Sequence, residues 1–201
     1  KATMDLAASS GLELGDAANT VVQAMGGFGL SANDAAQAVN ALAGAAAASS
    51  TDVGPLADAL SQCAAQAHTA GWSIQDTTAV LGAFADAGIA GSDAGTSLKT
   101  MLQRLGAPTN AAAKEMKSLG INVWDSNGHM KDAGGIADEL KTHLGGLSDQ
   151  QKQQALATIF GSDATRAATV LMGEGSIGLS KYTKATNDQT AASRLANSQM
   201  G

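Results

Sequence analysis

Cysteine, proline and aromatic residues are scarce in this chain. Its 201 residues include one cysteine, two prolines, three phenylalanines, two tryptophans and one tyrosine. The single Cys63 excludes a disulfide within the chain, and its neighbours in the run ALSQCA predict a small buried residue rather than a reactive thiol. The 44% of residues that are hydrophobic are mostly small. Because burial stabilises at about 25 cal/mol per Å² of apolar area, we expect closely packed helices with a thin, marginally stable core.

We also expect no signal peptide, and the sequence shows neither a membrane-length apolar run nor an excess of basic residues. Its longest weakly apolar tract, residues 41–48, is far shorter than the ~18 residues that a membrane span needs. A net charge of −6 and a pI of about 4.8 argue against a nucleic-acid backbone as a partner of this segment. The first residue is Lys1 rather than Met, and we therefore expect a piece of a longer protein.

Alanine and glycine are abundant, and the glycines recur in one pattern. Gly71 opens GWSIQD and Gly88 opens GIAGSD, while Gly11 and Gly29 open the similar runs GLELGD and GLSAND. A left-handed Gly ends a helix by satisfying its last carbonyls, and the apolar residue after it packs back on that helix. Either a helix–Gly–helix unit has been duplicated, or alanine-rich helices with short Gly turns simply resemble one another. Both explanations predict helical hairpins.

Apolar spacing, caps and breaks predict the positions of the helices. Ser73 and Ser148 each stand three residues before a side chain that can complete a capping box, and Thr109 can cap the segment after Pro108. The expected helices cover approximately residues 14–27, 32–48, 52–70, 74–87, 92–106, 110–119, 133–145, 149–160 and 162–172.

One stretch, INVWDSNGHMK at residues 121–131, resists a helical interpretation. Its β-branched and aromatic residues flank the pair Asn127-Gly128, a strong hairpin signal because both residues of such a turn must accept a positive φ. The predicted fold class is therefore all-α, a multi-helix array of short helical hairpins with one small β-hairpin near residues 121–131. Residues 1–172 are the predicted core domain. Residues 173–201 are predicted to be a Gly-rich joint and a helical or partly disordered continuation.

No motif predicts a catalytic, cofactor-binding or metal-binding residue. Gly173-x-Gly175-x-x-Gly178 matches the dinucleotide-binding fingerprint literally, but its neighbours are helical where the fingerprint needs a strand. We expect a flexible joint between helices there. Asp138 and Glu139 are adjacent, so on a helix they point in different directions and are expected on a solvated face rather than as an acid–base pair.

Two other groups of residues could suggest a metal. Asp125, Asn127, Gly128 and His129 do not match an EF-hand, which needs Gly at the sixth loop position and Glu at the twelfth, so a plain Asn-Gly turn is favoured. The chain's three histidines are far apart in sequence: His68, His129 and His143. No two of them have metal-binding helical spacing, and neither group predicts a metal site.

Three specific motifs occur in a fixed order: GIAGSDAGTSL at residues 88–98, LQRLGAPT at residues 102–109, and IFG at residues 159–161. With the sequence around them, from about residue 4 to residue 172, they resemble the core region of the tail tape-measure proteins of tailed phages. The resemblance implies a structural protein that lies in the lumen of the tail tube and governs tail length during assembly. It also implies release at genome ejection through the host envelope.

The resemblance implies partners and locations as well. The expected partners are tail tube and tail tip proteins, tail assembly chaperones and further copies of the chain in a homo-oligomer. The expected locations are the virion and then the host cell envelope, with no direct nucleic-acid binding by this segment. The family has no general catalytic residues, so none is transferred to this chain.

Two other classes of function stay open at this level. A helical protein-binding adaptor module without catalytic activity would have the same composition and the same helix pattern. A cell-wall hydrolase segment would instead need a cleft lined by two carboxylates, or a bound metal. The sequence has no signature of such a hydrolase.

Overall fold

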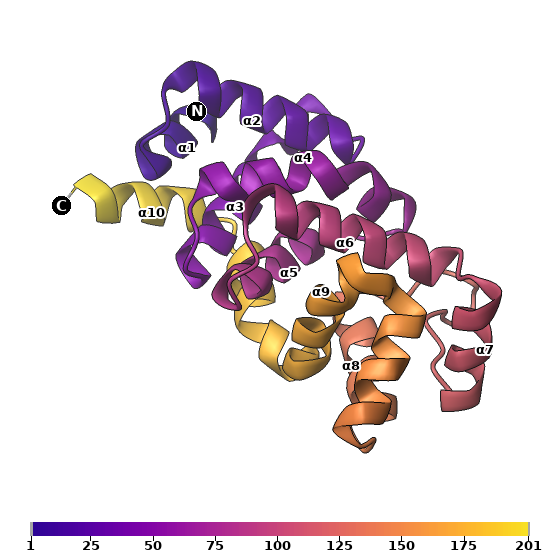
Figure 1. Cartoon of the computed structure of the whole chain (residues 1–201). Helices are drawn as coiled ribbons and strands as arrows, with labels where there is room; N and C mark the ends of the chain where they lie inside the picture. The colour runs from indigo at the N-terminus through magenta and orange to yellow at the C-terminus, as the bar shows by residue number, and fades with distance from the viewer. Residues whose placement is uncertain (1, 201) are drawn as a thin grey trace.

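The computed structural model describes residues 2–200, and all of the regular secondary structure in that range is helical. The elements, labelled in Figure 1, are α1 (Ala2–Ser10), α2 (Leu14–Gly27), η1 (Ala32–Asp34), α3 (Ala35–Ala48), α4 (Val53–Thr69), α5 (Ile74–Asp86), α6 (Gly91–Gly106), α7 (Asn110–Leu119), α8 (Ala133–Leu144), α9 (Asp149–Thr186) and α10 (Ala191–Met200). The all-α prediction is confirmed. Residues 1 and 201, the outer limits of the two predicted domains, lie outside the described range, and the division at residue 172 stays a prediction.

Left-handed glycines end the helices where the repeated pattern predicted them. The four predicted glycines all have positive φ: Gly11, Gly29, Gly71 and Gly88. At the end of α4, for example, Gly71 has φ +83° and the next residue, Trp72, donates its backbone N–H to Ala67 O at 2.9 Å. This bond satisfies a carbonyl that the helix leaves without a partner, and Trp72 is buried against the helix just completed.

The helices α2 to α6 form two layers. Within each layer, a helix packs beside the next helix but one in the chain. α2, α4 and α6 lie side by side, and α3 and α5 lie beneath them, in contact with the end of α9 (Figure 1). The most extensive helix pair is α4–α6, which are not consecutive. The short Gly links therefore build a continuous array rather than a row of separate hairpins.

One contiguous cluster of buried side chains joins all of these elements. Its largest fully buried members are Phe84, Phe160 and Tyr182, Trp72 also belongs to it, and much of the remainder is alanine. The accessible surface is 9201 Å². A compact monomer of this mass exposes about 8,700 Å². The described residues thus pack about as compactly as an ordinary globular domain, although many of the buried side chains are small.

The predicted β-hairpin at residues 121–131 is wrong. Within the described residues this stretch contains one isolated antiparallel bridge, Trp124–Met130, and no strand. Its turn is closed by Gly128 N donating to Asp125 O at 3.2 Å, so Ser126 and Asn127 are the central residues and neither has positive φ. The Asn-Gly pair therefore does not form the expected two-residue turn.

Side chains explain why no ladder grows from this bridge. His129 N donates to the Asp125 carboxylate at 2.9 Å instead of to a carbonyl of the opposite segment. Asn122 N donates to Glu139 in α8 at 3.1 Å, and Lys131 O accepts from the indole Nε1 of Trp72 at 2.9 Å. Bonds to the side chains of Asp125 in the loop, Glu139 in α8 and Trp72 in the link before α5 thus take the groups that a second and a third pair would need.

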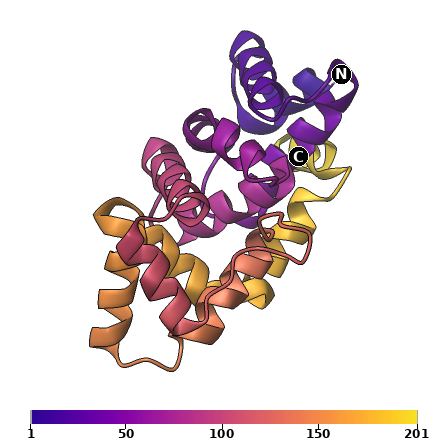
Figure 2. The ribbon, with the colours of Figure 1, turned by 90° about the vertical axis from the view of Figure 1, so that its right-hand side faces the viewer.

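The C-terminal part of the chain returns to the N-terminal helices. α10 packs against α1 and α3, so the first and last helices of the chain are neighbours (Figures 1 and 2). Asn40 in α3 secures the approach to α10, because its side chain donates to Gln189 O at 2.8 Å and accepts from Ala192 N at 3.1 Å. None of the helices in residues 2–200 has the length and apolar character to cross a membrane.

Candidate interaction site at the loop between α7 and α8

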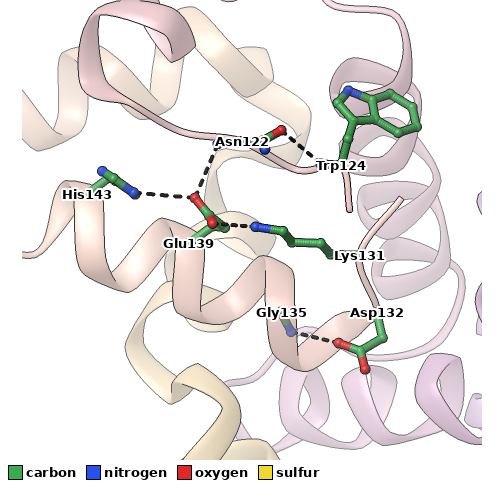
Figure 3. A network of polar contacts seen from close by, with 7 residues as sticks. All are labelled: Asn122, Trp124, Lys131, Asp132, Gly135, Glu139 and His143. Carbon is green, nitrogen blue, oxygen red and sulfur yellow. Dashed lines mark hydrogen bonds and ion pairs between the residues drawn. The ribbon is translucent and has the colours of Figure 1, made fainter. Parts of the chain in front are cut away.

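The loop of residues 120–132 is fixed at both ends by local chemistry. α7 ends at Gly120, whose φ is +76°, and Ile121 N then donates to Met116 O at 2.9 Å. At the other end the Asp132 carboxylate accepts from Gly135 N at 2.7 Å and caps α8 (Figure 3). Ile121 and Val123 are buried in the core cluster, so the loop is anchored on the helices beneath it.

Glu139 in α8 lies beneath this loop with two hydrogen-bond donors and the ring of His143 around its carboxylate (Figure 3). Its carboxylate accepts from Lys131 Nζ at 2.5 Å and from Asn122 N at 3.1 Å, and His143 Nε2 lies 3.4 Å from its second oxygen. Burial favours a higher pKa for Glu139, but the hydrogen bonds from Lys131 and Asn122 outweigh it and lower the pKa below its usual value. The carboxylate is therefore a charged structural tie that holds the loop on α8, and its lowered pKa makes it a weak general base.

The turn at the tip of the loop uses the Asp125 carboxylate in the same structural way. Asp125 Oδ1 accepts from Asn127 N at 2.8 Å and from His129 N at 2.9 Å. The bond from His129 N is the main reason that the pKa of Asp125 is lowered. The favoured prediction of a turn, rather than a calcium loop, agrees with these bonds, although the turn itself has a different register.

The side chain of Trp124 points away from the polar network (Figure 3), although its backbone N donates to Asn122 Oδ1 at 3.1 Å. Its side chain is one of the few large apolar side chains on the surface, with 40% of the residue exposed. Beside it an open groove of about 820 Å³ is bounded by the end of α4, the end of α6 and the loop. The groove is lined by Gln66, Thr69, Ala70, Gly71, Leu102, Gln103, Gly106, Ala107, Trp124, Gly128, His129 and Met130. An exposed tryptophan above an apolar groove is suited to binding another protein segment.

The residues that could have suggested a metal or a nucleotide lie on several different elements of the described chain. Within residues 2–200 no three His, Cys, Asp or Glu side chains are placed to hold a metal ion. Two of the histidines lie on separate helices, His68 on α4 and His143 on α8. Gly173 and Gly178 lie within α9, with helix on both sides rather than the strand that a nucleotide fingerprint needs.

Cys63 is buried as expected. None of its surface is exposed, and burial raises the pKa of its thiol to about 12. A thiol with so high a pKa carries almost no thiolate near neutral pH, and the thiolate is the nucleophilic form. Cys63 therefore acts as a small apolar side chain in the core.

The expectation of a solvated face holds for Asp138 but needs correction for Glu139. The two side chains do point in different directions, but Glu139 lies under the loop with only 18% of its side chain exposed. Asp138 is exposed as expected, and its carboxylate also accepts from Ser176 N in α9 at 2.7 Å. Sequence reasoning missed both roles, and the one available signal was the helical spacing from Glu139 to His143 and from Asp138 to Lys141.

The comparisons with known proteins add the family. The family model described as "Phage-related minor tail protein" matches residues 1–161. The chain belongs to this family. It is 37% identical over 131 residues to the tape measure protein of Pneumococcus phage Dp-1, a match covering 65% of this chain. It is 40% identical over 131 residues to the probable tape measure protein of Escherichia phage P2, covering 62% of this chain.

These matches cover only a small part of the relatives. The chain spans 11% of the Pneumococcus phage protein and 16% of the Escherichia phage protein. No solved structure matches the chain. The family match confirms the resemblance seen in the motifs at residues 88–109 and 159–161, and it identifies a helical structural protein of the phage tail.

Proposed function

We propose that this chain is a folded core segment of a tape measure protein, which lies in the lumen of the tail tube and governs tail length during assembly. At genome ejection the segment is released and passes into the host cell envelope. The observation that carries the proposal is the 37% and 40% identity to two tape measure proteins, each over 131 residues. The proposed role is structural and involves no catalysis.

The proposed partners are the tail tube and tail tip proteins, the tail assembly chaperones and further copies of the chain in a homo-oligomer. The groove beside Trp124 supports a protein partner, because it offers an exposed aromatic side chain next to an apolar surface. The net charge of −6 supports a role without direct contact to DNA, since a nucleic-acid backbone repels a surface of the same sign.

The segment would occupy very different lengths in a compact and in an elongated state. A compact chain of this size has a radius of gyration of about 16–17 Å, whereas one continuous helix of the same residues is about 300 Å long. Several compact copies side by side fill a space much wider than a bundle of single helices. We therefore propose that the segment is elongated in the packed tail and condenses into the helical array after release.

Tail length measured by electron microscopy tests this proposal. In a phage whose tape measure gene encodes this chain, an in-frame deletion of the segment should shorten the tail by about 300 Å if the segment is elongated. A length-matched helical sequence without the apolar core should restore the original length. Tails of unchanged length after the deletion would contradict the role in length control. A shortening of only about 40 Å would support that role but contradict the elongated state.

The groove beside Trp124 also favours a second candidate, a helical adaptor that binds another protein and does not measure length. An adaptor would tolerate the length-matched replacement poorly, because the replacement removes the groove together with Trp124. The deletion distinguishes the two functions, and the substitution Trp124→Ala in the intact tail protein tests the groove. Tails of unchanged length after the deletion, together with loss of virion assembly in Trp124→Ala, would favour the adaptor, whereas tails shortened by the deletion would favour the tape measure.

A further inference from the structure

Two glycines break α9 from within. Gly161 has φ 72° and ψ 179°, and Gly175 has φ 62° and ψ −176°. This region of backbone conformation is essentially restricted to glycine. The breaks divide α9 into three arms, residues 149–160, 162–174 and 176–186, and the flanking residues of each break remain helical. Either glycine could join its two arms into one longer helix by adopting ordinary helical angles.

Two side chains of α8 hold the second break in place. Lys141 Nζ donates to Gly173 O at 3.1 Å and to Glu174 O at 3.3 Å, the last carbonyls of the second arm. Ser176 N, the first N–H of the third arm, donates to Asp138 Oδ1 at 2.7 Å. An interrupted helix leaves carbonyls at one end and N–H groups at the other without partners. We call Asp138 and Lys141 the clamp, because together they supply both kinds of partner.

The fit between the clamp and the break is close. A Cβ atom added to Gly175 would lie 2.9 Å from Lys141 Cδ and 3.2 Å from Asp138 Oδ1. Both distances are shorter than ordinary van der Waals contact, so a side chain at position 175 would force Lys141 or Asp138 to shift. The glycine conformation and the two charged side chains therefore belong to one arrangement.

The chain beyond the break forms a strap over the N-terminal half. We define the strap as residues 176–198, the third arm of α9 and the described side chains of α10. Its main anchors are Leu179 and Tyr182, which are 2% and 1% exposed. Tyr182 Oη also donates to the Asp86 carboxylate at the end of α5 at 2.6 Å. The strap thus connects the α8–α9 end of the array to α3, α5 and α1.

We propose that Gly175 is a conformational joint which the clamp keeps bent, and that release of the clamp lets residues 162–186 form one continuous helix and lifts the strap off α3 and α5. In the straight helix, the carbonyl and N–H groups at the break bond to each other along the helix. They then no longer require Lys141 and Asp138 as partners. Burial of Leu179 and Tyr182 opposes straightening, and the bent state is therefore the one observed. This property concerns the chain itself and goes beyond the proposed role in the tail.

The test uses the full 201-residue chain with the double substitution Asp138→Asn and Lys141→Met. Spin labels are placed at two exposed positions, Ser162 and Lys184, in a Cys63→Ala background, and their separation is measured by pulsed electron paramagnetic resonance. In a continuous helix their Cα atoms are about 33 Å apart, and any bend at the joint brings them closer. We call molecules with this separation the straight population.

We expect the clamp variant to add a straight population that the parent chain lacks. Backbone amides of residues 179–186 should also exchange with deuterium about tenfold faster, because charge-assisted bonds holding the bend are lost. Amides of α4 should be unaffected. Faster exchange without a straight population would mean that the strap merely loosens and would overturn the proposal, as would no change in either measurement.

Two further variants make the test specific. Asp149→Asn with Lys152→Met removes an Asp–Lys pair of the same spacing, 3.9 Å apart in the first turn of α9, which spans no break. This control should leave the label separation unchanged, and a straight population there would count against the clamp. Gly175→Ala disfavours the bent backbone directly and should produce the straight population with the clamp residues intact. A bent Gly175→Ala chain would contradict the joint.

Discussion

Gly95 lies in α6 where this helix crosses α4, and the backbones of the two helices approach closely there. A Cβ atom at this position would lie 2.0 Å from Ala59 O and 2.9 Å from Ala59 Cα. Both distances are shorter than 3.0 Å, a separation below which real Cβ contacts essentially never fall. Because both atoms belong to the α4 backbone, no smaller side chain on α4 relieves the clash. Gly95→Ala can be accommodated only if the two helices move apart.

The loss of stability in Gly95→Ala depends on the packing that is lost when α4 and α6 move apart. α4 and α6 share the most extensive helix interface of the array, and Leu98, Leu102 and Leu105 of α6 are at most 1% exposed. A gap of about 0.5–1 Å already loses about a quarter to a half of the dispersion energy between two surfaces. Overpacking costs about 1–3 kcal/mol, and a clash with backbone belongs at the upper end. The helix propensity of Ala returns about 1 kcal/mol. We expect a net loss of about 2 kcal/mol.

Urea denaturation followed by circular dichroism measures this change, with Gly26→Ala as the matched control. Gly26 is also helical, in the last turn of α2, but nothing lies within 4 Å of a Cβ added there. Gly26→Ala should therefore stabilise the chain by about 0.5 kcal/mol, whereas Gly95→Ala should destabilise it and lower Tm by about 4–8 °C. If the two variants are equally stable, the close approach of α4 and α6 is refuted.

Further predictions concern single interactions elsewhere. Burial alone would raise the pKa of Asp86, but hydrogen bonds from Tyr182, Ser50 and Lys181 lower it to about 2. The contribution of Asp86 to the free energy of unfolding is therefore complete above its pKa in the unfolded chain, near 4, and is lost as the pH falls toward 2. The shift corresponds to about 2.5 kcal/mol, which partial exposure reduces to about 1 kcal/mol. Urea melts should show Asp86→Asn less stable by that amount at pH 7 and equal to the parent at pH 2; a constant difference would contradict this. Ser148→Ala removes the capping box of α9 and should cost about 1 kcal/mol in the same melts, and an unchanged midpoint would contradict the cap. Glu139→Gln should accelerate amide exchange at Asn122 severalfold, since the charge that holds the loop is lost; unchanged exchange there would refute the tie.

The ends of the helices were predictable because their chemistry is local. A Gly that turns left-handed, the apolar residue after it and a Ser or Thr cap all lie within six residues of one another, so the sequence contains the whole signal. Thr109 caps α7 by accepting from Ala112 N at 3.2 Å, and Ser148 and Gln151 form the expected capping box. The Asn127-Gly128 signal misled, because the carboxylate of Asp125 fixes a different turn and the ends of the loop are held by Glu139 and Trp72, which are distant in sequence.

The contacts that organise the strap were unpredictable for the same physical reason. Asn40 binds Gln189 across 149 positions, and Tyr182 binds Asp86 across 96. No spacing rule connects residues that far apart. The glycines show the limit most clearly: Gly44 and Gly26 both lie within alanine-rich helices, yet a Cβ on Gly44 would lie 2.1 Å from Ala185 O. Which glycine permits a close crossing depends on the helix opposite, and local sequence does not specify that helix.

The Trp124 groove and the clamp show how an alanine-rich chain can be specific with so little large apolar surface. Small side chains bury little area each, so their packing discriminates weakly between alternative arrangements. Single polar ties, such as Glu139 beneath the loop and Asp138 at the break of α9, fix positions that packing alone leaves free. Such ties contribute about 1–2 kcal/mol each, which is enough to select one arrangement and little enough to be released. A chain built this way keeps its helices while the contacts between them change, and this is the property that the proposed elongation in the tail requires.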